Sequence, residues 1–91
     1  MTKSDLIALL ATKEDLTEVS AARIVNLIFD GFEDSLIKGD RIEIRGFGRF
    51  VVREYKTYTG RNPKTGNVVE VKPKKLPFFK VGKELKERIN N

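Results

Sequence analysis

The sequence of 91 residues contains no cysteine and no histidine. Without cysteine, the chain cannot form disulfides, thiolate metal sites or a thiol nucleophile. Without histidine, it also lacks the commonest general base at neutral pH and the usual imidazole ligand of zinc. We therefore expect no metal, no cofactor, no small-molecule substrate and no enzymatic activity.

Long hydrophobic runs are also missing. No segment approaches the roughly 18 apolar residues that a membrane span needs, and no signal-peptide hydrophobic run follows the first residues. With 40% hydrophobic and 34% charged residues, the composition is that of a globular chain with room for one domain. We expect a cytoplasmic protein with no membrane partner.

The charge is unevenly distributed along the chain. The formal net charge is +5, with 18 basic and 13 acidic residues. Residues 1–40 contribute 4 basic and 8 acidic side chains, whereas residues 41–91 contribute 14 and 5. Such an asymmetry indicates a face that meets a polyanion, nucleic acid first among them. A solvated basic face with no ligand is the alternative interpretation.

The first part of the chain has helical signals. Thr2 and Asp5 form a capping-box pattern that predicts a helix to about Lys13, and Thr17 and Gly39 bound a second helix over roughly residues 18–38. Eight apolar side chains of this second helix share an arc of about 160°, more than one packed face of ~100° requires. They are Ala21, Ala22, Ile24, Val25, Ile28, Phe29, Phe32 and Leu36. This width favours self-association, unless the first helix and the strands cover the whole arc.

After Asp40 the hydrophobic period changes from 3.6 to 2. The segment 41–45 alternates, which places Ile42 and Ile44 on the inner side of a strand. Gly46 and Gly48 fit a turn into a second strand better than a nucleotide-binding loop, because Val51 stands where a G-x-G-x-x-G motif has its third glycine.

Residues 53–72 predict a basic two-stranded ribbon. Residues 53–59 are β-prone without an aliphatic face, residues 60–66 are typical of a hairpin tip, and residues 67–72 of the returning strand. Its basic side chains are Arg53, Lys56, Arg61, Lys64, Lys72, Lys74 and Lys75, and Thr57, Thr59 and Asn62 add hydrogen-bonding groups. Pro63 at the tip is either an ordinary turn residue or an apolar wedge that enters a base step.

The last segment restores apolar residues and adds a helix. Residues 76–81 are expected to close the sheet, and Gly82 opens a helix over 83–89. Lys83 then lies at a helix N-terminus, as Lys3 does in the first helix. Either lysine could meet a phosphate there, or both could simply be solvated.

Three segments, residues 41–50, 60–66 and 77–83, strongly resemble the bacterial HU and integration host factor proteins. The resemblance spans essentially the whole chain and implies an α+β fold of one domain, residues 1–91, in an intertwined dimer. The helical dimerisation part would be residues 1–39, the sheet and DNA-binding arm residues 40–81, and the C-terminal helix residues 82–91. Each arm would enter the minor groove of double-stranded DNA, with Pro63 intercalated to bend the duplex.

The same resemblance implies the site residues and the biological role. The DNA contacts would be Lys3, Arg45, Arg53, Tyr55, Tyr58, Arg61, Asn62, Pro63, Lys64, Lys75 and Lys83. The dimer core would be Val25, Ile28, Phe29, Phe32, Leu36, Phe47, Phe50 and Phe79. Such proteins organise the bacterial nucleoid and assist recombination, replication and transcription.

The subtype and the partner chain stay open at this stage. Glu43 and Arg45 resemble the β subunit of integration host factor, whereas HU proteins usually carry less polar residues there. The chain would form either a homodimer or a heterodimer with a related subunit. A small RNA-binding protein is the alternative from composition alone. A nuclease is disfavoured, because the acidic residues of the basic half are scattered among lysines rather than clustered for Mg²⁺.

Overall fold

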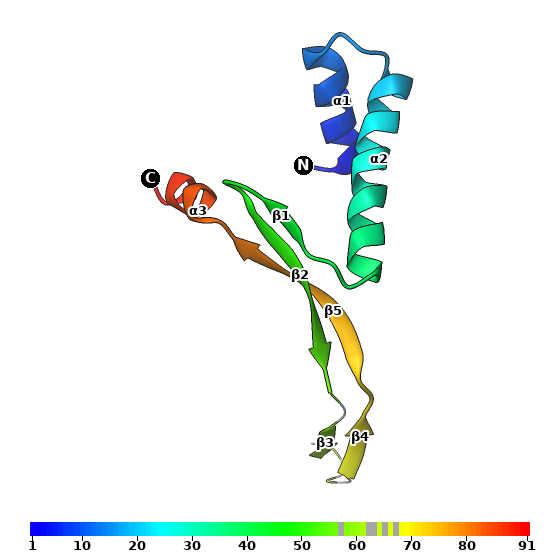
Figure 1. Cartoon of the computed structure of the whole chain (residues 1–91), viewed down its shortest axis with the longest axis vertical. Coiled ribbons are helices and arrows are strands. Elements are labelled where there is room, and N and C mark those ends of the chain that lie inside the picture. The colour runs from blue at the N-terminus through cyan, green and yellow to red at the C-terminus, as the bar shows by residue number, and fades with distance from the viewer. Residues whose placement is uncertain (57, 62–63, 65, 67) are drawn as a thin grey trace.

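The computed structural model describes the chain except residues 57, 62, 63, 65 and 67 (Figure 1). A helical hairpin stands beside a twisted sheet, from which a narrow arm extends. The elements are α1 (Lys3–Lys13), α2 (Glu18–Ile37), β1 (Ile42–Ile44), β2 (Gly48–Tyr55), β3 (Tyr58–Arg61), β4 (Val68–Val71), β5 (Lys74–Val81) and α3 (Lys83–Ile89). The predicted α+β fold is confirmed.

The helix ends follow the predicted capping signals. The Thr2 hydroxyl accepts a hydrogen bond from the Asp5 amide at 3.1 Å, and the Asp5 carboxylate accepts one from the Thr2 amide at 2.9 Å. The Thr17 hydroxyl caps α2 by accepting from the Ser20 amide at 3.1 Å. Gly39, with φ of 84°, follows the end of α2, where a left-handed residue lets the chain leave the helix. The capping-box prediction is confirmed, and α2 ends one residue earlier than predicted.

The body sheet is antiparallel, with strand order β1-β2-β5. Ile42 and Ile44 are half-buried and Glu43 is exposed, as the alternating pattern predicts. Strand β1 is shorter than the predicted 41–45 segment by one residue at each end. Strands β2 and β5 pair over their whole length, from Gly48 opposite Val81 to Tyr55 opposite Lys74. The base of the arm is therefore part of the body sheet.

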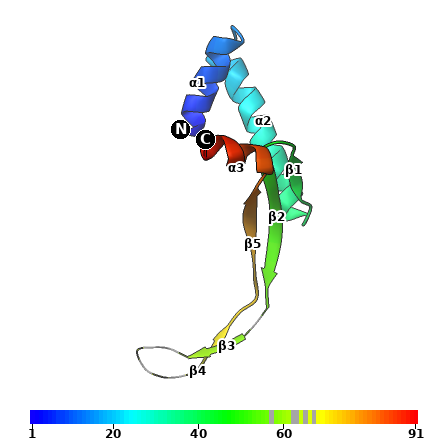
Figure 2. The ribbon, with the colours of Figure 1, turned by 90° about the vertical axis from the view of Figure 1, so that its left-hand side faces the viewer.

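This pairing corrects the predicted ribbon. Residues 53–55 belong to β2 and pair with residues 74–76 of β5, whereas the outer arm is a separate two-stranded sheet of β3 and β4. Gly60 and Arg61, predicted in the tip, lie in β3. Pro73, between β4 and β5, has no backbone N–H to donate, so the ladder is interrupted there. Figure 2 shows β3 and β4 turned away from the line of β2 and β5.

Gly46 lies in a turn between β1 and β2, as predicted, and Gly48 begins β2. Gly46 has a φ of 84°, which favours glycine, and the Phe47 amide donates to the Ile44 carbonyl at 3.0 Å. A Cβ on Gly48 would lie 2.5 Å from Cζ of Phe79 and 2.6 Å from the Lys80 carbonyl oxygen. The Gly82 amide donates to the Phe47 carbonyl at 2.8 Å, which joins this turn to the start of α3.

Gly48→Ala is expected to lower the free energy of unfolding by about 1–3 kcal/mol, the usual cost of forcing extra volume into a packed site. Urea denaturation followed by circular dichroism measures it. Gly31→Ala is the matched control, because a Cβ on Gly31 in α2 meets nothing within 4 Å and alanine favours a helix. Equal stability of both variants would contradict the close packing at Gly48.

A single chain buries little of its apolar surface. Ala21 and Val25 are the buried hydrophobic residues among those described, while Ile28 and Phe29 keep 48% and 39% of their surface exposed. The accessible surface is 8090 Å², against about 5400 Å² for a folded monomer of this mass. The radius of gyration is 19.2 Å, against about 12 Å for a compact domain. Helix α1 and the strands therefore leave the apolar arc of α2 incompletely covered.

In the described part of the chain, none of the helices combines the length and the apolar character that crossing a membrane requires.

Candidate nucleic-acid interface

The two faces of the body sheet have different chemistry. The inner face looks toward α2, and there Phe79 packs on Phe50 and Phe47 with ring centroids 4.8 and 5.6 Å apart. The residues between these positions point to the opposite side. We call this side the outer face, made of Glu43, Arg49, Val51, Arg53, Tyr55, Lys74, Leu76, Phe78 and Lys80. It carries four basic side chains and one acidic one.

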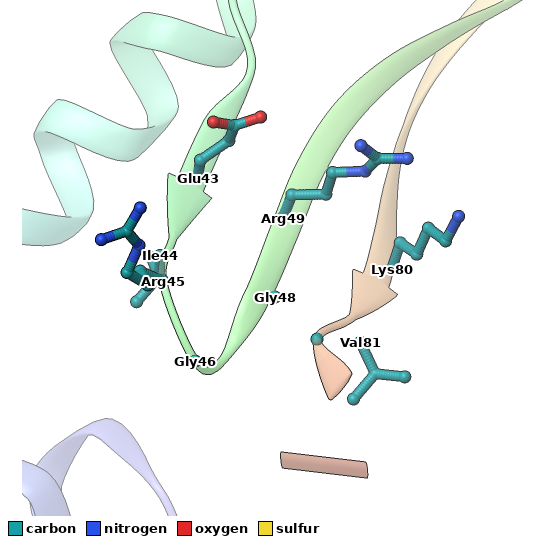
Figure 3. A pocket seen from close by; sticks show the side chains of 9 residues that line it. Glu43, Ile44, Arg45, Gly46, Gly48, Arg49, Lys80 and Val81 are labelled. Carbon is teal, nitrogen blue, oxygen red and sulfur yellow. The ribbon is translucent and has the colours of Figure 1, made fainter. Parts of the chain in front are cut away.

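At the body end of the outer face, charged residues lie in a row across the strands. Arg49 of β2 is opposite Glu43 of β1 on one side and Lys80 of β5 on the other. Figure 3 shows Arg49 and Lys80 extending from neighbouring strands, with Arg45 set apart just after β1. These residues line an open depression of about 500 Å³. Glu43 is held by Arg41 at 3.3 Å, so the Arg49 and Lys80 charges dominate this end.

At the arm end of the outer face, two cations lie over aromatic rings. Cζ of Arg53 is 3.4 Å from the centroid of the Phe78 ring. Nζ of Lys74 is 6.0 Å from the centroid of the Tyr55 ring, at the outer limit of a cation–π contact. The predicted site residues Arg53 and Tyr55 are thus brought together on one face.

Lys75, also a predicted DNA contact, lies on the other face. Register places it opposite Glu54, and its Nζ is 3.3 Å from the Glu54 carboxylate. Both side chains are about 70% exposed, so the pair is solvent-screened and adds little stability. Arg53 and Lys75 therefore border opposite sides of the arm base.

Lys3 and Lys83, the two predicted DNA contacts at helix N-termini, differ in their own contacts. Lys3, the first residue of α1, donates from Nζ to the Asn26 side-chain oxygen of α2 at 2.8 Å. Lys83, the first residue of α3, is 88% exposed in its side chain and lies 4.0 Å from Glu87. Lys83 is consequently the more available of the two for an anion.

The predicted contacts of the outer arm are only partly described. Tyr58 and Arg61 are the first and last residues of β3, and Lys64 is exposed. Asn62 and the predicted wedge Pro63 lie outside the described residues.

The predicted dimer-core residues lie in two groups, one on α2 and one of phenylalanines at the sheet. Val25 is buried, Phe32, Leu36 and Phe50 are half-buried, and Ile28, Phe29, Phe47 and Phe79 are exposed. Phe29 and Phe32 contact edge to face, with centroids 6.0 Å apart. Exposed aromatic and aliphatic groups in contact with partly buried ones are typical of a surface that a partner covers.

Sequence reasoning missed three outer-face residues: Arg49, Lys80 and Phe78. The sequence predicts that Phe78 closes the sheet with its neighbours, but period-2 alternation places it on the opposite side from Phe79. The signal that identifies all three is the register of β5 against β2, which puts Phe78 beside Val51 and Lys80 beside Arg49.

A helical hairpin, a small sheet and a basic ribbon are features of DNA-binding proteins that place β-strands in a groove of the duplex. The described residues contain no group of three acidic side chains that could hold a metal ion.

Comparison with known proteins identifies the family. Residues 1–90 match the model of the bacterial DNA-binding protein family. An HU protein from Anabaena, solved in a cocrystal with DNA, is 31% identical with a TM-score of 0.83, over 98% of this chain and 97% of that one. A mutant HU protein from Thermotoga maritima is 31% identical with a TM-score of 0.70, over 98% and 99% of the two chains. A mutant of transcription factor 1, solved in solution, is 27% identical with a TM-score of 0.66, over 99% and 91%.

The chain belongs to the bacterial DNA-binding protein family, that of the HU proteins. The resemblance inferred from the three sequence segments is thereby confirmed at the level of the family. The likeness to the β subunit of integration host factor remains a prediction from Glu43 and Arg45.

Proposed function

We propose that the chain is an architectural protein that binds double-stranded DNA as a dimer and bends it. The observation that carries the proposal is the outer face, which has basic residues at both ends: Arg49 and Lys80 in the body, and Arg53 and Lys74 at the base of the arm. The DNA cocrystal of the Anabaena HU protein supports DNA as the polyanion. The bent DNA would belong to the bacterial nucleoid, where bending assists recombination, replication and transcription.

The proposed mechanism combines groove binding with intercalation. Each arm follows the minor groove, and Pro63 enters a base step at the tip. Unstacking a step costs on the order of a few kcal/mol, and bending a 20–30 bp site costs roughly 1–6 kcal/mol more. Neutralised phosphates must offset both costs, with Arg53 at the arm base and Lys3 and Lys83 near the flanking DNA that folds back over the body. Affinity therefore depends steeply on salt.

The experiment that tests this function uses the purified chain alone. Fluorescence anisotropy with duplex DNA, competed by duplex RNA of the same length, measures which nucleic acid is preferred. Energy transfer between dyes at the two DNA ends measures bending. The proposal is supported if the chain prefers DNA to RNA and if its binding shortens the distance between the two DNA ends. Preference for RNA, or a duplex that stays straight at saturation, contradicts it. Tight binding by this chain alone supports a homodimer over a heterodimer.

Lys83→Ala is expected to weaken DNA binding and to reduce the salt dependence. The slope of log affinity against log salt is about −0.9 per phosphate neutralised, so its magnitude should fall by about one for each phosphate that Lys83 no longer neutralises. Lys13→Ala is the control, because Lys13 lies in the last turn of α1, at the end far from the sheet (Figure 1). A slope unchanged by Lys83→Ala but lowered by Lys13→Ala would exclude Lys83 from the phosphate-binding residues.

A further inference from the structure

The closest cation–ring contact among the described residues joins Arg53 to Phe78. The two residues are diagonal neighbours on the outer face, since Arg53 is opposite Leu76 and Phe78 is opposite Val51. Diagonal pairs on one sheet face are within reach of long and aromatic side chains. A separation of 3.4 Å between Cζ and the ring centroid is van der Waals contact, so the guanidinium rests directly on the ring.

Within the described part of the chain, the Arg53 side chain donates no hydrogen bond. Among the described residues, none of the acidic side chains forms an ion pair with Arg53. The adjacent carboxylate, Glu54, lies on the inner face and pairs with Lys75. The ring contacts the guanidinium at its carbon, whereas the N–H groups lie around the edge of the guanidinium plane. The arginine is therefore fixed in place with its donors directed to solvent.

Phe78 itself is not explained by the packing of the core. Its side chain is 37% exposed and lies on the side of the sheet away from Phe47, Phe50 and Phe79. A large aromatic side chain on an exposed face between basic residues points to a role in presenting those residues. The neighbouring Lys74–Tyr55 pair repeats the arrangement at a longer distance.

We infer that Phe78 is a positioning residue for DNA binding, whose ring holds the Arg53 guanidinium ready to donate to a phosphate at the base of the arm. This inference rests on the proposed function. A flexible arginine must be ordered when it binds, and ordering it beforehand lowers that cost. Phe78 thus raises affinity without contributing any charge.

The test is a double-mutant cycle read by fluorescence anisotropy with duplex DNA at several salt concentrations. Phe78→Leu keeps an apolar side chain of similar reach but removes the ring. With two arms per dimer and the usual cost of ordering a long side chain at an interface, we expect affinity to fall roughly 5- to 100-fold. The salt slope should not change, because no charge is removed. Arg53→Ala should reduce the magnitude of the slope by about one for each phosphate that Arg53 no longer neutralises.

Two further variants distinguish a positioning role of Phe78 from a general stabilisation of the sheet. Phe78→Leu should have little further effect in a chain that already carries Arg53→Ala, whereas Phe78→Tyr, which keeps the ring, should bind as the wild type does. In the free protein, nuclear magnetic resonance should find the Arg53 side-chain protons shifted upfield by the ring, and the shift should vanish in Phe78→Leu.

Three results overturn the inference. If Phe78→Leu binds DNA with wild-type affinity, the inference fails and the proposed function stands. The same holds if Phe78→Leu lowers the affinity equally in chains with Arg53 and in chains with Arg53→Ala. Failure of the wild-type chain to bind DNA overturns it together with the proposed function.

Discussion

Ile28→Asp is expected to convert a folded dimer into a monomer that is largely unfolded. Ile28 lies on the apolar arc of α2 and is 48% exposed in the single chain. Fully burying an isoleucine side chain contributes about 1.5–3 kcal/mol, so covering the exposed half of Ile28 contributes about half of that, and a symmetric interface contains the residue twice. The substitution should therefore raise the dissociation constant roughly 10- to 100-fold, before the cost of burying a carboxylate is added.

Sedimentation velocity and circular dichroism at micromolar concentration measure this effect. Leu27→Asp is a close control: it adds the same charge one residue earlier, at a side chain that is 73% exposed and outside the apolar arc. We expect this control to remain a folded dimer. A wild-type chain that sediments as a folded monomer would refute dimerisation itself.

Pro63→Ala is expected to reduce DNA bending by tens of degrees, because wedge side chains kink a duplex by roughly 20–90° and alanine is too small to hold a base step open. The preference for nicked over intact duplex should fall with it, since a nick lowers the cost of the kink. Energy transfer between the DNA ends at saturating protein measures the bend.

Lys64→Ala is the comparison for this variant, because it removes a charge beside the wedge and keeps the proline. Lys64→Ala should lower the salt dependence of binding and leave the bend at saturation unchanged. Pro63→Ala should reduce the bend and leave the salt dependence unchanged. An unaltered bend in Pro63→Ala would show that another part of the arm deforms the DNA.

The helix boundaries were predictable because their signals are local. The capping partners Thr2 and Asp5 are three residues apart, and the glycine that follows α2 is adjacent to its last turn. Such signals depend on the backbone of a few neighbouring residues, so they can be read without the rest of the fold.

The division of the arm was not predictable in the same way. It depends on the pairing of Arg53 with Leu76, which are 23 positions apart, and sequence alternation does not specify which two positions lie opposite each other. The same limit applies to the site. Arg53 could be identified as a basic ribbon residue, but its contact with Phe78 and the placement of Lys75 on the other side both follow from register. The bond from Lys3 to Asn26 likewise joins two helices and has no local signal.

The interruption of the ladder at Pro73 has a consequence for how such proteins diversify. Because β3 and β4 form a sheet of their own, the segment between Tyr55 and Lys74 is an extension attached to the ends of β2 and β5. Grafting this segment from a relative should transfer bending behaviour and leave the body unaltered. Selection could then change the outer arm and the body of the protein independently.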